Sequence, residues 1–173
     1  TRARRGGRGY GGVYLGDGEG AGGQLGGVNL GWEQASNRLT KVREWGRLMS
    51  YLEQSTRYIA YDTRLGGRYR YYRDPEVLGS ALGLRYVGDM DRLFDSYAEL
   101  VPVMSDFYRD QFPKEPGDSD FVYRQAIRAK AFDAVRGVLP AASLSNVGIY
   151  GTGQGYEALL LRMRSPPLPQ SRA

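Results

Sequence analysis

The sequence of 173 residues contains no cysteine and no histidine. Without cysteine there are no disulfide bonds, thiolate nucleophiles or cysteine-bound zinc sites, and without histidine there is no Ser-His-Asp triad and no histidine acid–base catalysis. No apolar run reaches the roughly 18 residues of a membrane-spanning helix, and no signal peptide is recognisable. We therefore expect a cytoplasmic protein with no metal site and no membrane partner.

Lysine is also scarce. The 24 basic residues include three lysines, Lys41, Lys114 and Lys130, and all the others are arginine. The formal net charge is +5. Arginine presents a planar fork that binds phosphate or carboxylate through two parallel hydrogen bonds, so we expect an anionic partner: a nucleotide, a nucleic acid or an acidic protein. The length and the hydrophobic content of 41% are typical of one globular domain with a sizeable core.

Glycine and proline divide the chain into three predicted segments. Residues 1–31 are rich in glycine and arginine, residues 32–165 form the predicted domain, and residues 166–173 are rich in proline. The first segment has the composition of a flexible extension, but its RRGG at residues 4–7 is also typical of RNA-binding RGG segments. The Pro-rich end is also compatible with a core domain taken from a longer chain.

Hydrophobic periodicity predicts an α+β fold, with helices packed around a small antiparallel or mixed sheet. The predicted helices cover residues 32–54, 85–112, 121–139 and 156–164, and Pro102 is expected to kink or divide the second of them. Two short aromatic strands are predicted at 58–62 and 68–73, with a turn at 65–67, and 141–155 is predicted to be a loop.

The stretch YLEQSTRYIAYD, residues 51–62, places a carboxylate, a hydroxyl and a guanidinium at alternate positions: Glu53, Ser55 and Arg57. Together they could hold a phosphorylated nucleotide, with Arg57 on the phosphate, Ser55 as a donor and Glu53 as an acceptor for an N–H group. The same spacing also suits the solvated end of a helix, where Arg57 would interact favourably with the helix dipole. Spacing alone leaves both interpretations open.

Further arginine and glycine motifs have two interpretations each. Arg136 and Arg162 stand near predicted helix ends, where an arginine either caps carbonyl groups or reaches a ligand. The GTGQG at 151–155 precedes a helix and could bind an anion, although it is not a P-loop. The RYRYYRD at 68–74 either stacks on bases or forms a hairpin with tyrosines on one face and arginines on the other.

Taken in order, these motifs resemble the flavin-dependent thymidylate synthases, also called thymidylate synthase complementing proteins. The family's R-H-R-x7-S signature, which continues into E-x-S-x-R-Y, is matched at 47–58, its A-R-x-x-L-P at 135–140 and its L-x-L-R at 159–162. The resemblance extends from about residue 24 to residue 164, and the stretches 61–78 and 128–163 are most similar to the divergent bacterial branch.

The resemblance implies a homotetramer of α+β subunits that converts dUMP to dTMP. Members of the family bind FAD, and they use methylene-tetrahydrofolate and NADPH as co-substrates. The flavin route needs no cysteine to attack the pyrimidine ring, unlike the other class of thymidylate synthase, so the lack of cysteine is consistent with it. The residues carried over are Glu53, Ser55 and Arg57 for dUMP, Arg47 for FAD, and Arg136 and Arg162 as catalytic residues at the nucleotide.

The chain departs from the family pattern in several places: it has no histidine for the family's upstream H-x-S segment, and Thr152, Gly153 and Gln154 stand where the family has Asn-Ala-Arg. Trp45 and Gly46 stand where the family has the first arginine and the histidine of R-H-R. This departure, together with the RGG-like start, suggests a second hypothesis. In it the chain is a catalytically degenerate relative that acts as a structural or nucleic-acid-binding protein, with nucleic acid bound through the Arg/Gly-rich N-terminus.

Overall fold

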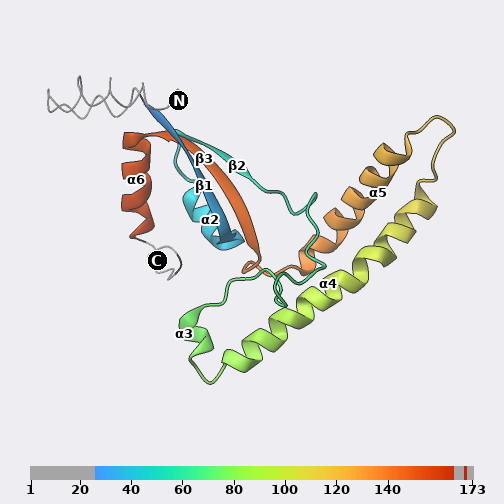
Figure 1. Ribbon diagram of the computed structural model, residues 1–173, viewed down its shortest axis with the longest axis horizontal. Helices are drawn as coiled ribbons and strands as arrows, with labels where there is room; N and C mark the ends of the chain where they lie inside the picture. Colours follow the sequence, from blue (N-terminus) through green and yellow to red (C-terminus); the bar gives the residue numbers. More distant parts are fainter. Residues whose placement is uncertain (1–25, 166–169, 171–173) are drawn as a thin grey trace, which may run out of the picture. The chain divides into compact units, whose positions relative to one another are not determined.

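The computed structural model describes residues 26–165 and Gln170, so the RGG-like stretch at 4–7 lies outside the described residues. The protein is α+β, as predicted, with a small three-stranded antiparallel sheet in the strand order β1-β3-β2 (Figure 1). The elements are β1 (Gly27–Ser36), α2 (Asn37–Arg43), β2 (Met49–Glu53), α3 (Pro75–Leu78), α4 (Gly83–Gln111), α5 (Asp120–Val135), a 3-10 helix (Arg136–Val138), β3 (Leu144–Thr152) and α6 (Gly153–Met163).

The single helix predicted for residues 32–54 is wrong, because β1, the short helix α2 and β2 occupy this part of the chain. The helical spacing of apolar residues misled the prediction. Along β2 the side chains of Met49, Tyr51 and Glu53 are half-buried while those between them are exposed, which is the two-residue period of a strand. Gly46, which weakens a helix, lies in the turn before β2.

The loop predicted for residues 141–155 is also wrong, since β3 is the central strand of the sheet. Its alternate residues Ser145, Val147, Ile149 and Gly151 are buried. Two of these four are small or polar, so the period of two was not visible as an apolar pattern. A central strand is paired on both edges, and this pairing compensates for its weak hydrophobicity.

The three later helices are confirmed as α4, α5 and α6. Pro102 lies inside α4, which continues through it and is not divided. The turn at 65–67 is confirmed, with Gly66 and Gly67 at φ angles of 56° and 77°, a left-handed conformation that glycine adopts without strain. The two aromatic strands are wrong: residues 58–62 form a turn and irregular chain, and residues 68–73 take part only in single antiparallel bridges, Leu65 with Arg68 and Tyr71 with Ser143. In the described part of the chain, no helix combines the length and apolarity needed to cross a membrane.

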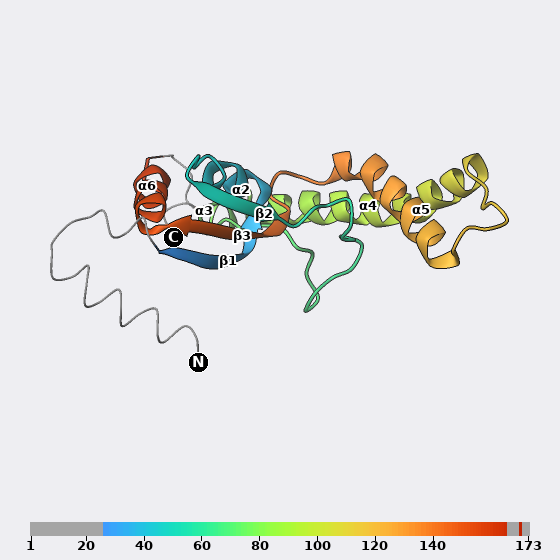
Figure 2. The ribbon, with the colours of Figure 1, turned by 90° about the horizontal axis from the view of Figure 1, so that it is seen from above.

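The chain divides into two compact units, and the second contains residues 33–40 and 53–146. Its helices α4 and α5 lie side by side (Figures 1 and 2). Phe94 of α4 is fully buried at the centre of an aromatic core, stacked on Tyr69 at 5.1 Å between ring centroids. The other buried members of this core are Tyr61, Tyr71, Tyr97, Phe132 and Val135.

The tyrosines of this core bury their rings and direct their hydroxyl groups to polar partners. Tyr71 Oη donates to Asp91 Oδ1 at 3.0 Å, and Tyr69 Oη donates to Asp95 Oδ1 at 2.7 Å. Burial, followed by the hydrogen bond to Asp91, raises the pKa of Tyr71 to about 12. The core therefore fixes the strand-like segment around residues 69–71 against α4.

The first unit contains the described residues 26–32, 41–52 and 147–165, together with Gln170. Its core joins α6 to one face of the strands. Leu159 and Met163 of α6 pack with Val147 and Ile149 of β3. The half-buried side chains around them are Trp32, Met49, Tyr51 and Tyr156.

Candidate functional site

Two of the predicted site residues meet at one carboxylate in the second unit. Arg57 Nε lies 3.3 Å from Asp133 Oδ1, and Arg136 Nη2 lies 3.0 Å from the same oxygen. Asp133 is near the end of α5 and Arg136 begins the 3-10 helix that follows it, while Arg57 belongs to the turn after β2. The fold thus brings together two guanidinium groups that are distant in the sequence.

Ser55 shares the turn of Arg57. The backbone N–H of Arg57 donates to Ser55 Oγ at 3.3 Å, and the backbone N–H of Tyr58 donates to Ser55 O at 3.2 Å. The Ser55 hydroxyl thus accepts a hydrogen bond from the chain and retains its own hydrogen for another acceptor. The interpretation of this stretch as a helix end is wrong, because it follows a strand.

Glu53 ends β2, and its carboxylate is half-buried. Glu53 Oε1 accepts a hydrogen bond from the fully buried Thr40 Oγ1 at 2.9 Å. This bond orients the Glu53 carboxylate. Glu53 ends the strand, while Ser55 and Arg57 follow it in the turn that the Tyr58 N–H closes on the Ser55 carbonyl.

The other two predicted residues, Arg47 and Arg162, lie in the first unit and line one pocket of about 270 Å³. Arg162, on α6, donates from Nη1 to the backbone carbonyl of Trp45 at 2.8 Å. Trp45 and Gly46, the two positions that depart from the family signature, line the same pocket. The remaining lining residues are Leu48, Met49, Gly155, Ala158 and Leu159.

Tyr51 holds the chain at Gly46. Its Oη accepts from the backbone N–H of Gly46 at 3.1 Å and donates to the Gly46 carbonyl at 3.2 Å. A Cβ atom at Gly46 would lie 2.5 Å from Tyr51 Oη, so the position favours glycine while Tyr51 is in place. Burial is the largest influence on Tyr51 and raises the pKa of its hydroxyl. This contact shapes the wall of the pocket.

The glycine-rich motif at 151–155 begins α6. Thr152 is the N-cap, and its Oγ1 accepts from the Gly155 N–H at 3.3 Å, which satisfies one of the donors that an anion would use. Gly155 is buried, and a Cβ there would come within 3.2 Å of Met49 Cγ. Close packing against β2 thus explains this glycine.

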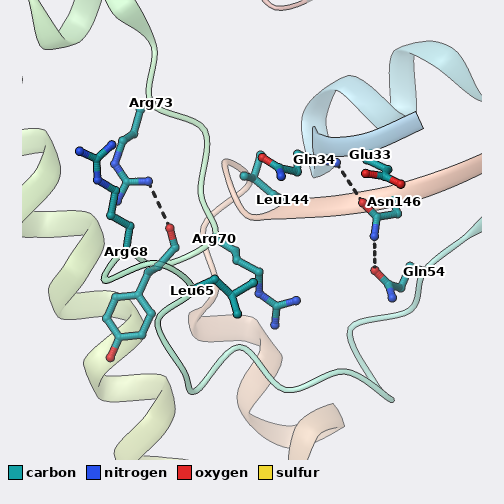
Figure 3. Close-up of a pocket in the computed structure, with 10 residues that line it drawn as sticks. Glu33, Gln34, Gln54, Leu65, Arg68, Arg70, Arg73, Leu144 and Asn146 are labelled. Carbon is teal, nitrogen blue, oxygen red and sulfur yellow. Dashed lines mark hydrogen bonds between the residues drawn. The ribbon is translucent and has the colours of Figure 1, made fainter. Parts of the chain in front are cut away.

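Sequence reasoning missed an arginine-rich pocket of about 420 Å³ in the second unit (Figure 3). Its lining includes Arg68, Arg70 and Arg73, which come from the RYRYYR stretch. The alternation of arginine and tyrosine in that stretch is visible in the sequence. Tyr69 and Tyr71 of that stretch are buried in the core, so stacking of these two rings on bases is wrong. The other wall is formed by residues with no motif in the sequence: Glu33, Gln34, Gln54 and Asn146. Leu65, Tyr69 and Leu144 complete the lining.

No protein-family model matches the chain. The chain is 40% identical over 151 residues to a UPF0159 protein of Chlamydia muridarum, and 38% identical over 151 residues to one of Chlamydia pneumoniae. A UPF0159 protein of Thermoplasma acidophilum is 30% identical over 166 residues. These alignments cover 87%, 87% and 83% of this chain but 28%, 28% and 33% of the three relatives. The chain therefore spans a third or less of the curated relatives that it matches, and their printed names state no substrate and no reaction.

Proposed function

We propose that the chain binds dUMP and, with FAD, takes part in the reductive methylation of dUMP to dTMP. The observation that supports this most is the meeting of Arg57 and Arg136 at Asp133. Both arginines were singled out from separate motifs of the sequence, and the fold places them at a shared partner. The two guanidinium groups outweigh the one carboxylate between them, so the arrangement provides a surface of net positive charge for a phosphorylated ligand.

Each side chain has a definite role in this proposal. A guanidinium has five N–H donors, so the contact with Asp133 leaves most donors of Arg57 and Arg136 for the phosphate and for negative charge that develops on the pyrimidine ring. Ser55 donates its hydroxyl hydrogen, and Glu53 accepts from the ring N–H group. Asp133 holds the two like charges close together, which would otherwise repel each other.

The pocket in the first unit has the chemistry that part of FAD requires. Arg47 supplies positive charge for a diphosphate, and Leu48, Met49 and Leu159 supply an apolar surface for an aromatic ring. Arg162 lines the same pocket and keeps in this proposal the role at the nucleotide that the resemblance gives it. The volume of about 270 Å³ is near the lower end of small-molecule pockets, roughly 300–1,000 Å³, so it suits one part of a dinucleotide. Bound FAD would supply the hydride chemistry that no side chain of the protein can supply.

A hydrogen bond to the backbone holds Arg162 in place. Because one of its nitrogens is engaged by the Trp45 carbonyl, its guanidinium is held at the pocket wall with the remaining donors available.

In the proposal methylene-tetrahydrofolate and NADPH are the co-substrates, and a homotetramer is the working assembly.

The proposal is tested by calorimetric titration of dUMP into the whole chain and into variants. Arg136→Gln should weaken binding about 10- to 100-fold, because a charge-assisted hydrogen bond contributes about 1.5–3 kcal/mol. Arg85→Gln is the matched control, since Arg85 is an exposed arginine of α4 that pairs only with Asp89 among the residues described. Equal dUMP affinity in both variants, or no binding by the unaltered protein, would contradict the nucleotide proposal.

The flavin half is tested separately by the absorbance of the purified protein between 350 and 500 nm. We expect a flavin spectrum to persist through gel filtration after FAD is added. A protein that stays colourless would contradict the flavin half and leave the nucleotide half to the titration.

A further inference from the structure

The arginine-rich pocket of the second unit is separate from the residues of the proposed dUMP site. Its lining does not include Glu53, Ser55, Arg57 or Arg136. The inference drawn from it therefore does not rest on the proposed function. With Arg68, Arg70 and Arg73 on one side and Glu33 on the other, the pocket residues carry an excess of positive charge.

Two of the arginines are held in place by tyrosine rings. The Cζ atom of Arg70 lies 4.3 Å from the ring centroid of Tyr61, and that of Arg73 lies 4.0 Å from the ring centroid of Tyr71. Both rings are 1% exposed in the aromatic core, so they form a rigid support. Cation–π contact with a fixed ring orders an arginine before any ligand arrives and lowers the entropy lost on binding.

The backbone satisfies only part of the donor capacity of these arginines. Arg70 Nη2 donates to the Ala60 carbonyl, and Arg73 Nη1 donates to the carbonyls of Tyr69 and Tyr71 at 3.2 and 3.4 Å. Within the described residues the buried Arg70 Nε has no hydrogen-bond partner, and Arg68, Arg70 and Arg73 have no carboxylate within ion-pair distance. A buried donor without an acceptor is costly, so Arg70 has unused donor capacity at this wall.

The opposite wall is a chain of amide groups. The Gln34 backbone N–H donates to Asn146 Oδ1 at 2.9 Å, and Asn146 Nδ2 donates to Gln54 Oε1 at 3.0 Å (Figure 3). Gln34 has a φ of 55°, a left-handed conformation that costs free energy for a residue other than glycine. The bond from its N–H to Asn146 maintains this conformation and fixes the wall.

The two walls differ in the chemistry that they recognise. The arginines offer forked donors to a phosphate, whereas Gln34, Gln54 and the carboxylate of Glu33 offer acceptors and donors to hydroxyl groups. The volume of about 420 Å³ is within the range of small-molecule pockets. We propose that this pocket binds a phosphomonoester of a small polyhydroxylated molecule, with the phosphate on the arginines and the hydroxyl-bearing body on the amide wall.

The experiment is a calorimetric titration of the whole chain with ribose 5-phosphate, inorganic phosphate and ribose. We expect ribose 5-phosphate to bind more tightly than inorganic phosphate and ribose not to bind measurably. Arg68→Gln should weaken ribose 5-phosphate about 10- to 100-fold, whereas Arg85→Gln should leave it unchanged. Arg68 is chosen because it is exposed and supports no other described side chain, so its replacement leaves the fold intact.

A second variant separates the two walls. Gln54→Ala should weaken ribose 5-phosphate several-fold and leave inorganic phosphate unchanged, because only the body of the ligand reaches the amide wall. The proposal is overturned if ribose 5-phosphate binds no better than ribose, or if the Arg68→Gln and Arg85→Gln variants bind it equally. dUMP is also titrated into the Arg68→Gln variant to compare this pocket with the proposed dUMP site. We expect the variant to bind dUMP as tightly as the unaltered protein does.

Discussion

Replacement of Gly46 by alanine tests the pocket wall in the first unit. The new Cβ would lie 2.5 Å from Tyr51 Oη and would displace a hydroxyl that makes two hydrogen bonds with the Gly46 backbone. Loss of both bonds costs about 1–3 kcal/mol, at about 0.5–1.5 kcal/mol each. The lower entropy of the unfolded alanine chain offsets about 0.4–1 kcal/mol of this. We expect a net loss of about 0.5–2 kcal/mol in the free energy of unfolding.

Urea denaturation followed by circular dichroism measures this change, with Gly31→Ala as the matched control. Gly31 lies in β1 with nothing within 4 Å of a built Cβ, so its replacement should change stability by less than about 0.5 kcal/mol. Tyr51→Phe removes the same hydrogen bonds without a clash, so its effect and that of Gly46→Ala should not add in the double variant. Equal stability of the Gly46→Ala and Gly31→Ala proteins, or full additivity with Tyr51→Phe, would refute the reasoning.

Three further predictions concern the second unit. Phe94→Ala should lower the free energy of unfolding by about 3–5 kcal/mol in urea denaturation, because a fully buried ring leaves a cavity, and a loss under about 1 kcal/mol would contradict the assigned core. Asp133→Ala should change stability by less than about 1 kcal/mol in the same assay, since its side chain is 40% exposed, and a larger loss would show a buried role. Tyr71→Phe should cost about 1.5–3 kcal/mol at pH 8 through the lost bond to Asp91. Because the folded pKa of Tyr71 is about 12 against an ordinary 10.0, its contribution is present below pH 10 and is lost as the pH rises towards 12. The stability difference between Tyr71→Phe and the unaltered protein should therefore shrink over that interval, and a constant difference would contradict the assignment.

The long helices could be predicted from the sequence because their apolar residues recur over several turns. In α4 the buried residues Phe94 and Tyr97 lie on the stripe that the periodicity identified. The short elements could not be predicted in the same way. Over residues 37–53 a seven-residue helix and a five-residue strand follow each other, and each is too short to establish its own period.

The site residues that belong to sequence motifs could be predicted from the sequence, whereas those that tertiary contacts bring to the site could not. Glu53, Ser55, Arg57 and Arg136 stand out by residue type and by resemblance, and their roles remain predictions. Asp133 has no motif, and its position between two arginines depends on the packing of α5. The amide wall of the arginine-rich pocket joins residues from β1, from the end of β2 and from β3, and only the sheet brings them together.

The most direct test of the central claim is formation of dTMP by the whole chain from dUMP and methylene-tetrahydrofolate with chemically reduced FAD, followed by chromatography of the nucleotides. The account predicts dTMP that depends on added flavin, is unchanged in Arg85→Gln and falls at least about 10-fold in Arg136→Gln. If the folded protein yields no more dTMP with flavin than without it, the claim that this chain acts in dUMP methylation is contradicted.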